Sequence, residues 1–173
     1  GETHQGIFDL SFLNTIPNLK IAAPKDFKEL EDMLIFAINQ NNPIAIRYPR
    51  GGEAKQKFNK HEPVTVGRAE ILKTGKDISL IAIGKMVSTA MQVAQNLQQQ
   101  NIEAEVINAR WIAPLDKQTI LNSARKTKLV YTIEDNIALG GLGTCVKELL
   151  SVENSIRVQS LGYPKEFIKH ASP

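Results

Sequence analysis

Short apolar runs alternate with amphipathic segments along most of the chain. A strongly apolar run lies at 78–84, further strand candidates lie at 104–107, 129–133 and 156–161, and a weaker one lies at 67–72. Between them, apolar positions recur at helical spacing over 86–100, after 115–116 and after 140–143. Because short apolar runs indicate buried strands and a 3.6-residue period indicates helices, the pattern predicts consecutive βαβ units. The expected fold class is therefore α/β, with a parallel sheet covered by helices.

The first third of the chain repeats this pattern on a smaller scale. Residues 19–22 and 44–46 are expected to be short strands, the second of them buried. Between them we expect an amphipathic helix that starts at Asp26, a residue suited to cap a first turn, and runs to about Asn41. The stretch 53–63 is polar and almost devoid of apolar residues, so it is interpreted as a linker.

Composition excludes several classes of partner. The 173 residues carry 21 Lys and Arg against 18 Asp and Glu, a net charge of +3. The basic residues are interleaved with acidic ones, which argues against nucleic acid. No apolar run approaches the roughly 20 residues of a membrane-spanning helix, so no membrane partner is expected. Cys145 is the single cysteine, which excludes an internal disulfide and favours a reducing, cytoplasmic compartment.

The chain opens on a polar, glycine-containing stretch without an initiator methionine. We therefore expect it to be part of a longer polypeptide and to carry only part of a functional site. His4 lies in this stretch, where an imidazole could serve as acid, base or hydrogen-bond donor. An exposed loop histidine without any chemistry explains the same position.

Two arginines, Arg47 and Arg50, follow the predicted strand at 44–46. In open parallel sheets, ligands bind beyond the carboxyl ends of the strands. A guanidinium there could hold a phosphate or carboxylate through two hydrogen bonds. A solvated surface pair is the other interpretation, and position alone does not separate the two.

The remaining polar features carry weaker signals. The turn Gly140–Gly143 lies between a strand and a helix, but it matches neither the dinucleotide-binding nor the P-loop pattern and is interpreted as a tight turn. The segment 134–136 (Glu-Asp-Asn) is expected just after a strand end, where it could belong to a site or cap a helix. Cys145 is expected to be a small core residue, and His61 and His170 surface residues. No Cys and His cluster has the spacing of a metal site.

Five stretches of the chain resemble the 1-deoxy-D-xylulose-5-phosphate synthase family, a transketolase-like, thiamine diphosphate-dependent group. The Thr-His-Gln-Gly-x-Phe-Asp run at 3–9 and Arg-Tyr-Pro-Arg-Gly at 47–51 are specific to this synthase. Residues 110–116, 134–136 and 140–143 resemble segments that transketolases and the β subunits of 2-oxo-acid dehydrogenases also share. The resemblance covers essentially the whole chain.

The resemblance implies an architecture and an oligomeric state. Residues 1–52 would be the C-terminal part of a pyrimidine-binding α/β domain, 53–63 a linker, and 64–173 a transketolase C-terminal-like domain. The missing N-terminal domains would bind the diphosphate and Mg²⁺ of the cofactor. The family is dimeric, which implies a homodimer.

The resemblance also implies an activity and site residues. The family condenses pyruvate with glyceraldehyde 3-phosphate, releases CO₂, and supplies isoprenoid and thiamine biosynthesis. His4 matches the active-site histidine, and Arg50 matches the arginine that binds the substrate phosphate. Arg47 matches a family arginine to which no role is assigned. The Mg²⁺ motif is absent from these residues, so the chain is expected to hold neither cofactor nor metal ligands and to be inactive alone.

Two other interpretations stay open. One is a transketolase or a 2-oxo-acid dehydrogenase E1 β-type chain, against which the run at 3–9 argues. The other is a non-catalytic module that acts in assembly or regulation. Binding of thiamine diphosphate would separate the last of these from a synthase.

Overall fold

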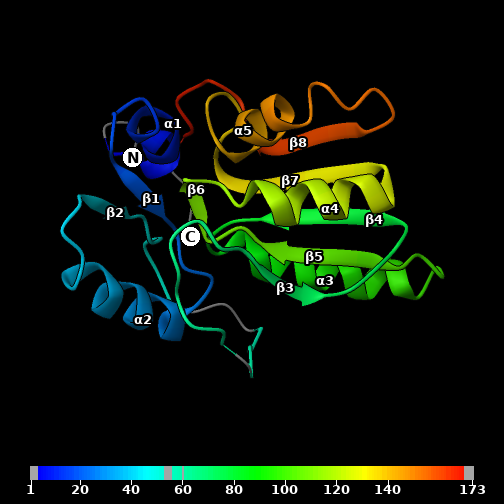
Figure 1. Cartoon of the computed structure of the whole chain (residues 1–173), viewed down its shortest axis with the longest axis horizontal. Coiled ribbons are helices and arrows are strands. Elements are labelled where there is room, and N and C mark those ends of the chain that lie inside the picture. Colours follow the sequence, from blue (N-terminus) through cyan, green and yellow to red (C-terminus); the bar gives the residue numbers. More distant parts are fainter. Residues whose placement is uncertain (1–3, 53–55, 60, 170–173) are drawn as a thin grey trace.

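A five-stranded sheet forms the larger half of the molecule (Figure 1). The computed structural model describes residues 4–52, 56–59 and 61–169. The strands stand in the order β3-β5-β4-β7-β8. They are β3 (Glu70–Lys73), β4 (Ile78–Ala82), β5 (Ala104–Asn108), β7 (Leu129–Ile137) and β8 (Arg157–Tyr163). The predicted strands of this half are thus confirmed, and β5, β4, β7 and β8 run parallel to one another.

The edge strand β3 departs from the expected parallel sheet, because it runs antiparallel to β5. Only the short turn 74–77 joins β3 to β4. A parallel connection needs a crossover of a dozen or more residues, so the chain must reverse direction here. The turn also packs tightly on β5, since a Cβ at Gly75 would lie 2.3 Å from the carbonyl carbon of Ala104.

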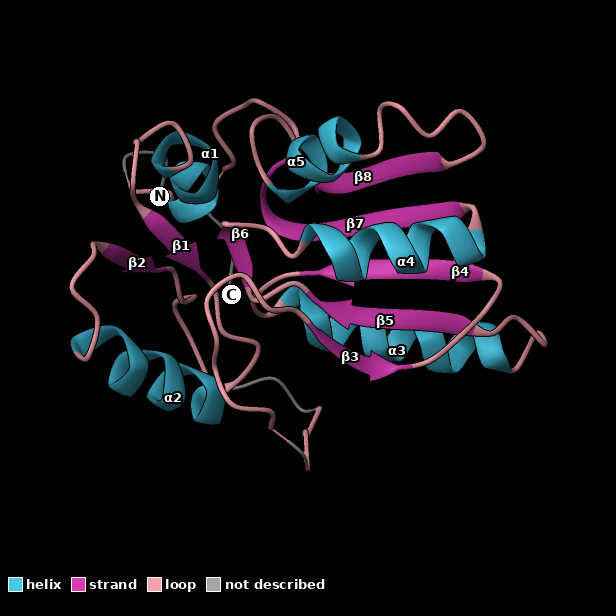
Figure 2. Cartoon of the chain, in the orientation of Figure 1, coloured by secondary structure: helices cyan, strands magenta, loops and turns pink. Residues whose placement is uncertain are grey.

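Helices cover both faces of this sheet (Figure 2). One face packs against α3 (Met86–Gln98), and the other against α4 (Lys117–Thr127) and α5 (Leu142–Leu149). Alternate side chains of β4 point to opposite faces of the sheet. Leu80 packs in the core under α3, and Ile81 packs in the core under α4 and α5. This two-sided burial explains why β4 is apolar apart from Ser79, which is itself buried.

A three-stranded sheet forms the smaller half, in the order β2-β1-β6. Here β1 (Lys20–Ala22) pairs in parallel with β2 (Ile44–Ile46) and antiparallel with β6 (Trp111–Ala113). The sequence did not predict β6, which comes from the second half of the chain and completes the sheet of the first. The expectation that 44–46 is buried was wrong, since β2 is an edge strand and half-buried. The domain boundary at 53–63 stays a prediction.

The helices of the smaller half begin where their capping residues predict. The Asp26 side chain accepts a hydrogen bond from Glu29 N and starts α2 (Phe27–Ile38), which ends a turn earlier than expected. In the larger half, the predicted start of a helix at 115–116 is also confirmed, since Asp116 accepts a hydrogen bond from Thr119 N and starts α4. The sequence predicted no structure near His4, but η1 (Gly6–Phe8) and α1 (Asp9–Leu13) form there, and Leu10 enters the main core.

A buried charge cluster joins the two halves. Two acids, Glu29 of α2 and Glu70 of β3, face two bases, Lys25 and Arg110, and all four are at most 3% exposed. Arg110 Nε lies 2.7 Å from Glu29 Oε1, and Lys25 Nζ lies 2.9 Å from Glu70 Oε2. Burial opposes charge on Glu70, but the hydrogen bond from Lys25 and the nearby Arg110 guanidinium outweigh it and lower its pKa. The two negative and two positive charges balance, because a buried charge without a partner would strongly destabilise the fold.

Candidate functional site

The carboxyl ends of strands from both sheets meet at one place. A Cβ at Gly84, two residues after β4, would lie 3.5 Å from the Cβ of Ala23, directly after β1. Arg47 N, directly after β2, donates to Ala22 O at 2.8 Å. Ligands of open α/β sheets bind outside the carboxyl ends of the strands, so this junction is the natural place for a site.

The structure places His4 and the two arginines on adjoining loops. His4 is exposed and lies two residues before η1. Arg50 is exposed in the loop after β2, next to Gly51, whose φ of 114° favours glycine. Arg47 links the two loops, because its Nη2 donates to Gly6 O at 3.2 Å.

Arg47 is anchored on the larger sheet as well. Its Nη1 lies 3.2 Å from Asp135 Oδ2, and its Nη2 donates to Asp135 O at 2.9 Å. Lys85, directly after Gly84, binds the same carboxylate at 2.9 Å. Burial disfavours the charge of Asp135, but the Lys85 ammonium and the Arg47 guanidinium more than offset this and lower its pKa. Asp135, paired with Arg47 and Lys85, therefore holds the His4 loop and the Arg50 loop against the carboxyl end of β7.

We expect the segment 134–136 to follow a strand end, but in the structure it lies inside β7. Its three residues bind different elements. Asn136 binds α1, since its Oδ1 accepts from Leu10 N and its Nδ2 donates to Ser11 Oγ, while Asp135 binds the Arg47 loop and Glu134 binds α5. The strand continues because its last residue, Ile137, still pairs with Tyr163 of β8. This segment thus fastens α1, the Arg47 loop and α5 to one strand.

Glu134 fills the N-terminus of α5. Its carboxylate accepts hydrogen bonds from Leu142 N at 2.9 Å and from Gly143 N at 2.8 Å. Burial raises the pKa of Glu134, and these two donors offset the effect only in part. A helix N-terminus favours an anion, and the chain supplies its own. The turn Gly140–Gly143 is therefore a tight packing turn in this structure.

Gly141→Ala is expected to lower the free energy of unfolding by about 1–3 kcal/mol, the usual cost of overpacking. The new Cβ would lie 2.0 Å from Glu134 Oε2, and moving that carboxylate breaks its bonds to α5. Urea denaturation measures the effect. Gly52→Ala is the matched control, because a Cβ there meets no atom within 4 Å. Equal stability of the two variants would contradict the packing role of Gly141.

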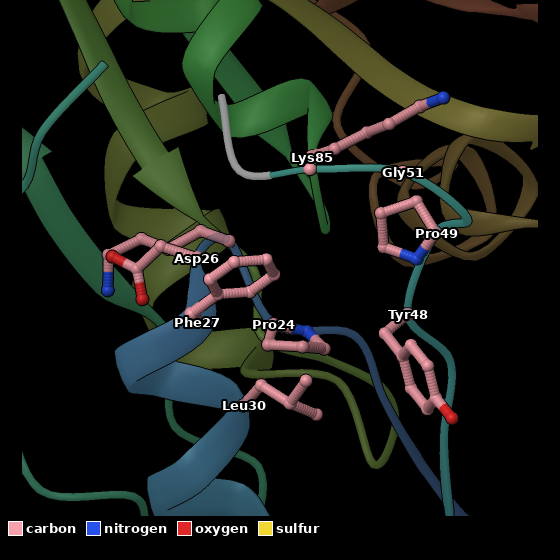
Figure 3. A pocket seen from close by; sticks show the side chains of 10 residues that line it. Pro24, Asp26, Phe27, Leu30, Tyr48, Pro49, Gly51 and Lys85 are labelled. Atoms are coloured by element: carbon pink, nitrogen blue, oxygen red, sulfur yellow. The ribbon is translucent and has the colours of Figure 1, made fainter. Parts of the chain in front are cut away.

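A pocket lies between the start of α2 and the arginine loop (Figure 3). Pro24, Phe27 and Leu30 form one side, and Tyr48 and Pro49 form the other. Phe27 and Tyr48 are more than half exposed, at 56% and 61%. The pocket adjoins Arg50 through its two chain neighbours, which both line it. Its walls are mainly apolar, with charge at the rim.

The other sequence candidates lie apart from this junction. Cys145 packs half-buried against the core; burial raises the pKa of its thiol, and Asn14 Nδ2 donates to it at 3.3 Å. His61, expected at the surface, is largely covered, with Nε2 2.7 Å from Asp26 Oδ2. His170 lies outside the described residues.

Within 4–52, 56–59 and 61–169, no group of three His, Cys, Asp or Glu side chains could hold a metal ion. In the same ranges, each helix is too short or too polar to span a bilayer.

Sequence reasoning missed the anchoring role of three residues, Arg47, Asp135 and Lys85. Arg47 and Lys85 follow the ends of β2 and β4 within three residues, a position that could have singled them out, whereas Asp135 lies near the end of β7. Arg47 and Asp135 are 88 residues apart in the chain, so no local pattern contains their pairing.

Two family models match the chain. The one described as "Transketolase, C-terminal domain" matches residues 67–173, and "Transketolase, pyrimidine binding domain" matches 1–53. The 1-deoxy-D-xylulose-5-phosphate synthase of Desulforudis audaxviator is 47% identical over 100% of this chain and 28% of its own length. The synthase of the same name from Halothermothrix orenii is 47% identical over 98% of this chain and 27% of its own length. The chain thus spans little more than a quarter of these relatives.

A solved structure has the same fold. It is titled "Split gene transketolase, inactive beta4 tetramer" and is 32% identical, with a TM-score of 0.91. The match covers 98% of this chain and 56% of that one. Both halves of the molecule, with their mutual arrangement, therefore have a counterpart in a solved protein.

Proposed function

Because the chain belongs to the transketolase family, we propose that it is the C-terminal part of a 1-deoxy-D-xylulose-5-phosphate synthase. The complete enzyme would use thiamine diphosphate to join pyruvate and glyceraldehyde 3-phosphate, with loss of CO₂. The observation that carries the proposal is the Arg47 bridge, which joins the His4 loop to the Arg50 loop at the carboxyl ends of the strands. Such an arrangement suits a proton donor and an anion-binding group that act on one substrate.

The described residues do not fit the diphosphate and Mg²⁺ of the cofactor. They contain no cluster of metal ligands, and the N-terminus of α5 is filled by the Glu134 carboxylate. The proposal therefore assigns that site to the part of the synthase outside this chain. It also holds that the chain alone is inactive, as the split-gene transketolase tetramer is described to be.

In the complete enzyme, His4 would donate a hydrogen bond to the substrate and transfer a proton. Arg50 would bind the phosphate of glyceraldehyde 3-phosphate. The complete enzyme is proposed to be a cytoplasmic homodimer that supplies isoprenoid and thiamine synthesis. Pyruvate-dependent CO₂ release in the presence of glyceraldehyde 3-phosphate tests the activity. Turnover by the chain alone would contradict the inactivity, and no turnover by the complete protein would contradict the function.

Arg50→Gln in the complete synthase is expected to raise KM for glyceraldehyde 3-phosphate by about 10- to 100-fold, since hydrogen bonds to charged groups contribute about 1.5–3 kcal/mol. Steady-state kinetics measure the effect. With unphosphorylated glyceraldehyde, the variant and the wild type should have the same KM, because the lost partner is the phosphate. Arg157→Gln, at an exposed position of β8, is the control. A KM change of the same size for both aldehydes would contradict a phosphate role.

A further inference from the structure

The segment that follows β8 folds back onto the loop that carries His4. In Figure 1 the segment after β8, drawn in red, runs back beside the N-terminal helix α1, drawn in blue. Gln5 and Ile168, 163 residues apart, are joined by two hydrogen bonds. Gln5 Nε2 donates to Ile168 O at 2.5 Å, and Ile168 N donates to Gln5 Oε1 at 3.1 Å. The side-chain amide next to His4 therefore pairs with this segment as a second backbone strand would.

An aromatic contact fastens the same segment at a second point. The rings of Phe8, in η1, and Phe167 meet edge to face, with centroids 5.9 Å apart and an interplanar angle of 74°. Phe167 is 72% exposed, so its ring is not part of a core. Its contact with the end of η1 is therefore local to the loop rather than a general contribution to the fold.

Arg47 also anchors the loop, on its other side, since it holds the carbonyl of Gly6 as described above. His4 and Gln5 precede η1 and belong to no helix or strand. Each anchor on an irregular loop narrows the range of conformations that the loop samples. The two contacts at Gln5 and Phe8 therefore restrict the stretch from which the His4 side chain extends.

We propose that residues 164–169 form a strap that positions His4 for the reaction. This inference rests on the proposed function, in which His4 acts on the substrate. The strap does not touch the reacting atoms, so Gln5, Phe167 and Ile168 are positioning residues. Geometry of this kind matters because a misplacement of about 1 Å can cost roughly 10²-fold in rate.

Variants of the strap test the proposal in the complete synthase. Phe167→Ala removes the ring contact, and Ile168→Pro removes the N–H that Gln5 accepts. Each is expected to lower kcat by about 5- to 20-fold, below the roughly 10²-fold limit for a 1 Å displacement. KM for glyceraldehyde 3-phosphate should change by less than about 2-fold, because Arg50 is not held by the strap. Phe167→Tyr, which keeps the ring, should restore kcat.

A matched control variant and a double-mutant cycle distinguish a positioning role from general destabilisation of the protein. Lys165→Ala, at an exposed position of the same strap, should leave kcat unchanged. Gln5→Met and Ile168→Pro together should cost no more than Gln5→Met alone, because Gln5→Met already breaks both hydrogen bonds and Ile168→Pro breaks one of the same two. Thermal unfolding of all variants should stay close to wild type. A fall in kcat that follows a fall in melting temperature would overturn the proposal.

Amide hydrogen exchange of residues 5–9, measured on this chain, gives a readout besides activity. Exchange should become faster in Phe167→Ala and Ile168→Pro and stay unchanged in Lys165→Ala. Unchanged exchange, or unchanged kcat in an active synthase, overturns the role of the strap alone. An inactive wild-type synthase overturns the proposed function and the catalytic role of the strap together, while exchange still reports whether the strap orders the loop.

Discussion

Glu29→Gln is expected to lower the free energy of unfolding by about 3–5 kcal/mol, the usual cost of removing one partner from a buried ion pair. The Glu29 carboxylate is 1% exposed and accepts hydrogen bonds from Lys25 N, Lys25 Nζ, Arg110 Nε and Asn108 Nδ2. A glutamine of the same shape directs an NH₂ group at donors and leaves two buried cations facing Glu70 alone. Urea denaturation of the chain at pH 7 measures the change.

Glu31→Gln, on the same helix, is the control. Its carboxylate is 62% exposed and binds Lys28 Nζ at 3.1 Å, so its loss should cost less than about 1 kcal/mol. The slope of the free energy against urea concentration should be similar in both variants if each unfolds in two states. Equal destabilisation by the two substitutions would contradict the view that burial makes the Glu29 cluster costly to break.

His4→Ala in the complete synthase is expected to lower kcat by about 10²–10⁴-fold, the usual contribution of a positioned acid or base. KM for glyceraldehyde 3-phosphate should change little, because Arg50 still binds the phosphate. His4→Ala and Arg50→Gln therefore distinguish the two roles, because the first should change kcat and the second KM. Single-turnover measurements with pyruvate and glyceraldehyde 3-phosphate distinguish a slower chemical step from slower product release.

His61→Gln is the control for His4. His61 pairs with the capping residue of α2 and is assigned no contact with substrate. Its substitution is expected to leave kcat within about 3-fold, since it removes no proposed proton donor. A His4→Ala enzyme with near-normal kcat would refute the role implied for His4, even if the synthase activity itself is present.

Local signals in the sequence were sufficient for most of the elements. The apolar runs at β4 and β5 predicted buried strands, and Asp26 and Asp116 predicted helix starts that the structure confirms. Each of these features depends on residues within a few positions of one another, where periodicity and capping act. The position of Arg50 beyond a strand was also readable, because the carboxyl ends of strands are a general place for ligands.

Pairings between distant residues had no such signal. Strand β6 joins a sheet whose other strands, β1 and β2, lie at 20–22 and 44–46, and its three residues carry no pattern of their own. Glu134 is an ordinary polar residue in the sequence, and only the close approach of α5 makes it the anion at a helix N-terminus. Composition and spacing do not encode which surfaces of a chain will meet.

The sequence by itself therefore determined the α/β class, the order of the main elements and the residues that resemble a synthase site. The tertiary structure alone decided what holds those residues. It brought Arg47 to Asp135, closed a neutral charge cluster between the two halves, and laid residues 164–169 beside Gln5. The physical reason is that periodicity and capping act within a few residues, whereas ion pairs and hydrogen bonds between remote segments form only once the whole chain has packed.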